Sequence, residues 1–98
     1  MSPETVPMTK QQQKVLFGGV VQGVGFRFTA SRLAGEYDIS GYVKNLPDGR
    51  VECVVEGEPD DIQAFVDALS VTMSDYIKTR AQQEVPYSGK FTGFGVSY

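Results

Sequence analysis

The segment that most constrains the fold is a glycine-rich stretch at residues 18–27, GGVVQGVGFR. It places four glycines in eight residues between a β-branched run and a segment with helical spacing. We interpret it as the end of a strand, a tight loop and the start of a helix. Glycine permits positive φ, so consecutive backbone N–H groups can converge on one point at the positive end of that helix, where an anion is favoured. These N–H groups belong to Gln22, Gly23, Val24, Gly25 and Phe26.

Arg27 follows the loop directly and is the second reason to expect an anion site there. Its guanidinium is planar, permanently charged and matched to two phosphate oxygens. We therefore interpret residues 22–27 as a phosphate-binding loop. The alternative is a glycine-rich turn that precedes an exposed arginine on a surface helix.

The composition indicates one globular domain with an excess of acidic residues. The chain has 98 residues, of which 12 are acidic and 9 basic, for a formal net charge of −3. No overall positive field attracts nucleic acid or an anionic membrane, so an anionic ligand requires a local positive pocket. No apolar run approaches the roughly 20 residues that span a bilayer, and no secretory pattern opens the chain. We expect a cytoplasmic monomer with neither membrane nor nucleic-acid partners.

Two residue types limit the chemistry available to this chain. It has no histidine, which removes the usual general base, the commonest metal ligand and every Ser/His or Cys/His pair. Its single cysteine, Cys53, alternates with Val51 and Val55, so we interpret it as a core residue and not as a nucleophile. The acidic cluster at residues 58–61 fits the start of a helix better than a metal site.

Hydrophobic periodicity predicts the order strand, helix, strand, strand, helix, strand. Strands are expected at residues 14–21, 39–46 and 51–56, and a helix at residues 26–35; a second helix opens at residues 58–61 and has its last apolar position at Met73. Residues 80–85 and 91–96 are the candidates for the closing strands. This order predicts an α+β fold of the ferredoxin-like βαββαβ split type, an antiparallel sheet with two helices packed on one face. Residues 1–13 are expected to form a disordered tail, and residues 14–98 the domain.

Two blocks of the sequence resemble the signatures of the acylphosphatase family. Residues 19–27, GVVQGVGFR, are similar to the first signature. Residues 41–57, GYVKNLPDGRVECVVEG, match the second without a mismatch. Both occur in the expected order on the βαββαβ pattern, and the resemblance extends over about residues 15–98. The domain at residues 14–98 is therefore expected to be acylphosphatase-like.

The resemblance implies hydrolysis of the carboxyl–phosphate bond of acyl phosphates by water attack on phosphorus. The products would be a carboxylate and inorganic phosphate, with no metal or cofactor. It also implies that Arg27 and Asn45 are catalytic and that residues 22–27 bind phosphate. From its position alone, Asn45 is a residue that ends a strand before the Pro47 turn. Phe17 and the doubled glycine at Gly18 depart from the family pattern.

Two other functions remain open at this point. The same loop could serve a non-catalytic module that binds phosphate or a phosphorylated protein. The RNA-recognition fold shares the topology, and residues 23–28 superficially echo one of its motifs. That block, however, precedes a helix instead of lying on a central strand, and the chain is acidic, so we do not favour RNA.

Overall fold

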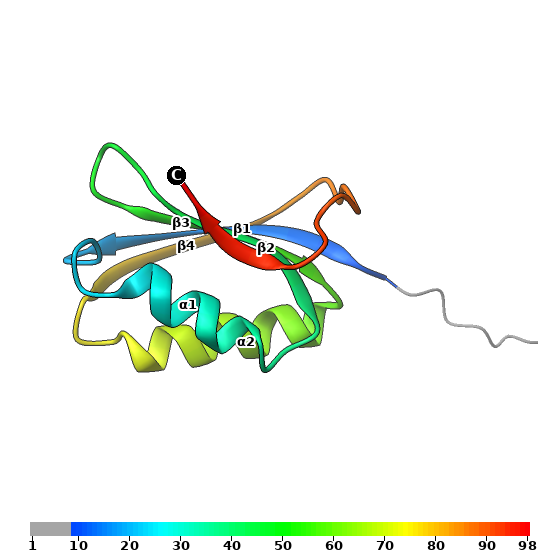
Figure 1. Cartoon of the computed structure of the whole chain (residues 1–98), viewed down its shortest axis with the longest axis horizontal. Coiled ribbons are helices and arrows are strands. Elements are labelled where there is room, and N and C mark those ends of the chain that lie inside the picture. The colour runs from blue at the N-terminus through cyan, green and yellow to red at the C-terminus, as the bar shows by residue number, and fades with distance from the viewer. Residues whose placement is uncertain (1–8) are drawn as a thin grey trace, which may run out of the picture.

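A computed structural model describes residues 9–98, which form a five-stranded sheet and two helices (Figure 1). The order of elements is the predicted one, with two closing strands. The elements are β1 (Gln11–Gly19), α1 (Phe26–Ala34), β2 (Ile39–Asn45), β3 (Val51–Gly57), α2 (Pro59–Thr72), β4 (Ile77–Val85) and β5 (Phe94–Ser97).

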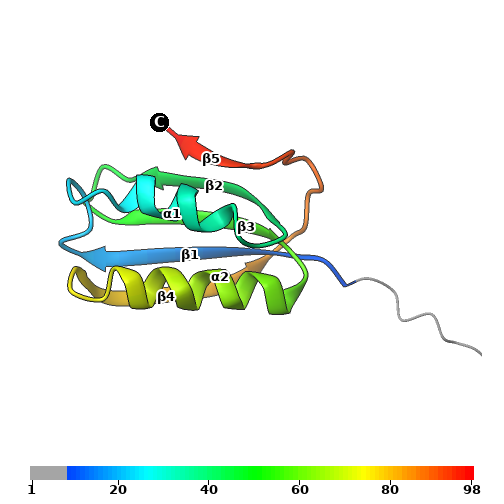
Figure 2. The ribbon, with the colours of Figure 1, turned by 60° about the horizontal axis from the view of Figure 1, so that its bottom comes forward.

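The sheet has the order β4-β1-β3-β2-β5, and both helices cover one of its faces (Figure 2). The pairs β1–β4, β1–β3 and β2–β3 are antiparallel, as predicted. The pair β2–β5 is parallel, with Gly41 opposite Phe94 and Val43 opposite Val96. The ferredoxin-like α+β fold is therefore confirmed, but the sheet is mixed and not wholly antiparallel. The parallel edge strand runs toward the same end of the sheet as β2, where β2 stops at Asn45.

Alternation along the strands and a 3.6-residue period along the helices build one core. Val15 and Phe17 of β1 face inward and are fully buried, and Cys53 of β3, which pairs with Val15 across the strands, is buried beside them as its alternation predicts. Burial raises the pKa of the Cys53 thiol, so it remains protonated and unreactive. The helices contribute Phe26, Ala30, Ala34, Ile62, Phe65, Val66 and Leu69 to the same core, and Met73, the C-cap of α2, adds to it.

Strand β1 begins at Gln11, three residues before the predicted start, and ends two residues earlier than predicted. Gln11 pairs with Gly57 of β3, and Gln12 pairs with both Glu56 of β3 and Val85 of β4. A strand between two neighbours is held by main-chain hydrogen bonds and needs no apolar side chains at its end. Within the predicted tail, residues 11–13 are thus in the sheet, and residues 1–8 lie outside the described residues.

Glu56 of β3 fixes the connection between β4 and β5. Its carboxylate accepts hydrogen bonds from the backbone N–H of Ser88 at 2.7 Å, the Ser88 hydroxyl at 2.8 Å and the backbone N–H of Gly89 at 3.1 Å. The Gln12 side chain donates another. Burial alone would raise the pKa of Glu56, but these bonds to the charged form outweigh it, and the pKa is lowered. Glu56 therefore anchors the segment that leads into β5.

Candidate active site

The loop between β1 and α1 has the left-handed backbone that its glycines predict. Gly23 has φ of 79° and Gly25 has φ of 77°. A Cβ at either position would meet no atom within 4 Å, so glycine is required for backbone conformation and not for space. Gly25 is the N-cap of α1, and no side chain caps this end of the helix.

The backbone N–H groups of residues 22–28 have no hydrogen-bond acceptor among the described residues. The first bond of the helix runs from the N–H of Thr29 to the carbonyl of Gly25, at 2.9 Å. No acidic residue lies in the first turn to neutralise this end. Unpaired donors at the positive end of a helix make a binding site for an anion. The set of free N–H groups extends two residues further into the helix than the sequence suggested.

The side chain of Gln22 joins this loop to the turn between β2 and β3. Its Nε2 donates to the carbonyls of Leu46 at 2.8 Å and Arg50 at 3.0 Å. The same turn is closed by a bond from the Leu46 N–H to the Arg50 carbonyl, at 2.8 Å. Asn45 is the last residue of β2 before that turn. Gln22 thus sets the distance between the loop and Asn45, a role that the sequence analysis missed.

The two departures from the family pattern have structural reasons. Phe17 is fully buried, and its ring centroid lies 5.1 Å from that of Phe26. Its ring therefore packs in the core against the first residue of α1. Gly18 lies at a register shift between β1 and β4, where a Cβ would collide with the Thr79 hydroxyl. At Gly19, which has positive φ, a Cβ would collide with the Tyr76 carbonyl. The doubled glycine lets the strand end pass close to β4.

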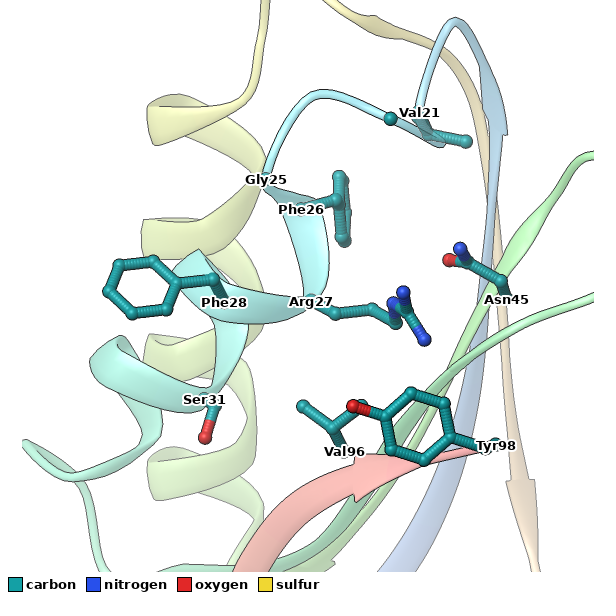
Figure 3. A pocket seen from close by; sticks show the side chains of 10 residues that line it. Val21, Gly25, Phe26, Arg27, Phe28, Ser31, Asn45, Val96 and Tyr98 are labelled. Atoms are coloured by element: carbon teal, nitrogen blue, oxygen red, sulfur yellow. The ribbon is translucent and has the colours of Figure 1, made fainter.

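A cavity of about 360 Å³ opens between the loop, α1, the end of β2 and β5 (Figure 3). The side chains of Arg27 and Asn45 extend into it from opposite walls and point toward each other. Of the phosphate-loop residues named from sequence, Gly23, Gly25 and Phe26 also line it, whereas Gln22 and Val24 do not. The lining residues are Val21, Gly23, Gly25, Phe26, Arg27, Phe28, Ser31, Asn45, Val96 and Tyr98.

Arg27 is partly exposed and makes no ion pair within residues 9–98. Its Cζ lies 5.1 Å from the centroid of the Tyr98 ring, a cation–π contact. An uncompensated guanidinium beside free N–H groups makes the cavity locally positive in a chain of net negative charge. The cavity therefore provides the local positive pocket that an anionic ligand requires.

The Oδ1 atom of Asn45 is buried and has no hydrogen-bond partner among the described residues. Most buried polar side-chain atoms in proteins have one. A carboxamide both donates and accepts, and its terminal torsion is broad. No protein donor to its oxygen fixes the Asn45 amide, so a bound ligand or water can orient it.

Four lining residues, Phe28, Ser31, Val96 and Tyr98, were not singled out from the sequence. Val96 and Tyr98 reach the cavity only because β5 runs parallel to β2, which no local pattern encodes. Phe28 carried a weak signal, since it is a large apolar residue outside the buried stripe of α1.

Within residues 9–98, no group of three or more histidine, cysteine, aspartate or glutamate side chains is placed to hold a metal ion. Neither α1 nor α2 is long and apolar enough to cross a membrane. The candidate site is made up of the loop, Arg27, Asn45 and the other residues that line the cavity.

Fold and site together define a class of protein: a ferredoxin-like α+β domain with a glycine-rich loop between its first strand and first helix. The family model for acylphosphatase matches residues 13–96. The chain belongs to the acylphosphatase family, as its two sequence blocks implied.

Individual relatives agree with this assignment. An acylphosphatase of Marinobacter nauticus is 37% identical over 92 residues, which cover 93% of this chain and 100% of that protein. One of Thermococcus kodakarensis is 52% identical over 48 residues, which cover 49% of this chain and 53% of that protein, so this match spans about half of each. The crystal structure of acylphosphatase from Bacillus subtilis has a TM-score of 0.80 and 29% identity, covering 92% of this chain and 100% of that one.

Proposed function

We propose that this protein is an acylphosphatase that hydrolyses the carboxyl–phosphate bond of acyl phosphates. The observation that carries the proposal is the cavity in which unpaired N–H groups, an unpaired guanidinium and a carboxamide meet. Phosphoryl transfer depends mainly on positioning and on stabilising charge on the phosphoryl oxygens. The groups that line this cavity can supply both the positioning and the charge stabilisation without first rearranging.

The phosphoryl group binds at residues 22–27. Backbone N–H groups of the loop donate to its oxygens, and Arg27 donates from the opposite side as a charged fork. Gly23 and Gly25 make the loop conformation possible, and the Gln22 side chain holds the loop against the hairpin that carries Asn45. Arg27 stabilises the charge of the transition state, because it remains charged throughout.

Asn45 positions the attacking water. Its amide accepts from the water and donates to a phosphoryl oxygen, which aligns the water with the scissile P–O bond. An aspartate there would add negative charge beside an anionic substrate. The Oδ1 atom supports this role, because no group of residues 9–98 donates a hydrogen bond to it.

The reaction needs no strong acid and therefore no histidine. The water oxygen forms a bond to phosphorus, and the P–O bond to the acyl group breaks. The electron pair of that bond leaves on a carboxylate, which is a weak base, and the proton of the water passes to solvent. The products are a carboxylate and inorganic phosphate. We infer that the enzyme requires neither metal nor cofactor and acts as a cytoplasmic monomer on small acyl phosphates, without nucleic-acid or membrane partners.

The central test measures hydrolysis of benzoyl phosphate by ultraviolet absorbance. We expect Arg27→Ala and Asn45→Ala each to lower kcat by about a hundredfold or more. Arg32→Ala is the matched control for Arg27, because it removes the same charge from an exposed position on α1 and does not line the cavity. Its activity should equal that of the wild type.

Three other outcomes would overturn parts of the proposal. Full activity in either site variant would discard the assigned residues, and inhibition by a chelator would contradict the metal-independent mechanism. If the wild type binds inorganic phosphate but hydrolyses no acyl phosphate, the protein is a phosphate-binding module instead.

A further inference from the structure

The segment that joins β4 to β5 lies on the side of the sheet that the helices leave uncovered. β4 and β5 are the two edge strands, and three strands separate them. Figure 1 shows the connecting residues 86–93, which we call the strap, on the side of the sheet away from α1 and α2. The strap contains no helix or strand of its own. Its position therefore depends on its contacts with the sheet.

Two side chains of the sheet hold the strap. Glu56 of β3 and Tyr42 of β2 alternate with buried core residues, so both lie on the face away from the helices. The Glu56 carboxylate accepts four hydrogen bonds, and three of them come from Ser88 and Gly89 of the strap. The Phe91 ring packs against Tyr42, with ring centroids 5.9 Å apart.

The contact with Glu56 is the more specific of the two. Glu56 is only 3% exposed, and burying a carboxylate is unfavourable unless hydrogen bonds compensate for the lost water. The donors of the strap provide that compensation. A glutamine in its place would turn an amide N–H group toward at least one of these donors, because both carboxylate oxygens accept from the strap. The strap is thus fitted to a carboxylate at this position.

Strand β5, which follows the strap, has few other attachments. It has four residues and pairs with β2 alone. On the helix side, Phe94 and Val96 pack against the core. On the other side, β5 has only Gly95 and Ser97, whose small side chains offer little to pack. The strap is therefore the main restraint on β5 from the face away from the helices.

The position of β5 matters because this strand forms part of the active-site cavity. Val96 and Tyr98 line that cavity, and the Tyr98 ring lies 5.1 Å from the Arg27 guanidinium carbon. We propose that Glu56 is a positioning residue for the active site: by fixing the strap it sets the position of β5, and so that of Tyr98 over Arg27. Glu56 pairs with the start of β1, whereas Arg27 follows the end of that strand, so the effect acts along the length of the sheet.

This inference rests on the proposed function, and a double-mutant cycle on benzoyl phosphate hydrolysis tests it. We expect Glu56→Gln and Tyr98→Ala each to lower kcat/KM about twofold to fivefold, as for the loss of one exposed cation–π contact. The double variant should lose no more than either single variant, because both changes remove the same contact. Ser88→Asp is a second test from an exposed position: its carboxylate repels that of Glu56 and should cause a similar loss.

Two control variants separate positioning from a general loss of stability. Ile62→Val weakens the core under α2, on the other face of the sheet from the strap, and should lower the free energy of unfolding. Glu84→Gln removes a carboxylate from an exposed position on β4. Neither residue lines the cavity. At 25 °C, where both variants are folded, each should keep the kcat/KM of the wild type.

Amide hydrogen exchange measures the restraint on β5 without using activity. In Glu56→Gln, residues 94–97 should exchange faster than in the wild type, while β1 and β3 keep their protection. If the wild type hydrolyses no acyl phosphate, the proposed function is wrong, and the exchange result still decides whether Glu56 holds β5. If hydrolysis occurs but Glu56→Gln and Ser88→Asp keep the wild-type kcat/KM, or the losses in the double variant multiply, the positioning role is wrong. Unchanged exchange at residues 94–97 would also reject it.

Discussion

Replacing Asn45 by alanine should separate stability from activity. The Oδ1 of Asn45 has no donor in the described protein, and the residue lines the cavity, so its replacement breaks no hydrogen bond to that oxygen within residues 9–98. Strand propensities span only about 1 kcal/mol in total, so the change in propensity is also small. We expect Asn45→Ala to leave the free energy of unfolding within about 1 kcal/mol of the wild type, while kcat falls about a hundredfold or more.

Chemical denaturation at 25 °C measures the first quantity directly. In a thermal scan, a change of about 1 kcal/mol corresponds to a shift in Tm of about 4–8 °C for a domain of this size, so the Tm of Asn45→Ala should stay within that range of the wild type. Lys44→Ala is the control from the adjacent position of β2, which does not line the cavity; its free energy of unfolding should stay within about 0.5 kcal/mol of the wild type. Inorganic phosphate should stabilise Asn45→Ala as well as the wild type, because the loop and Arg27 are retained.

The reasoning fails if Asn45→Ala unfolds more easily than the wild type by about 2 kcal/mol or more, since the amide would then contribute to packing or hydrogen bonding in the free protein. It also fails if the variant keeps its activity.

Three further changes test other parts of the structure. Gln22→Ala removes both hydrogen bonds between the loop and the hairpin turn, so the free energy of unfolding should fall by about 1–3 kcal/mol and kcat should also fall; an unchanged kcat would show that the turn needs no such support. Gly25→Ala places a Cβ at φ of 77°, which costs about 1–2 kcal/mol, and calorimetry should find weaker binding of inorganic phosphate; equal affinity would contradict the need for a left-handed residue. Glu56→Gln tests pH dependence: because the folded-state pKa of Glu56 is lowered, its contribution to stability is present above the ordinary glutamate pKa of about 4.3 and is lost as the pH falls toward the folded value. The wild type should therefore lose stability below that pH more steeply than Glu56→Gln does, and parallel profiles between pH 3 and 6 would exclude Glu56 as the cause.

The order of the elements could be predicted from the sequence because its signals are local. Apolar periodicity marks α2, with Ile62, Phe65, Val66 and Leu69 all buried as their spacing predicts. Alternation around Cys53 likewise identifies an inward strand face. The loop before Arg27 could also be predicted from the sequence, since a left-handed backbone conformation favours glycine.

Other features depend on pairings between distant segments. The start of β1 at Gln11 follows from main-chain bonds to β3 and β4, to which the polar side chains of residues 11–13 give no clue. The hydrogen-bond partners of the Gln22 side chain, Leu46 and Arg50, lie 24 and 28 residues further along the chain. These two contacts therefore could not be predicted from the sequence.

The sequence by itself determined which groups this protein offers to the proposed phosphoryl site: loop glycines, Arg27 and Asn45, with no histidine among them. Only the tertiary structure decided what stands around them. The parallel pairing of β5 with β2 brings Tyr98 over Arg27 and, with Phe28, leaves two exposed rings at one cavity. The physical reason is that backbone conformation is encoded by neighbouring residues, whereas the walls of a cavity come from segments that meet only when the sheet has formed.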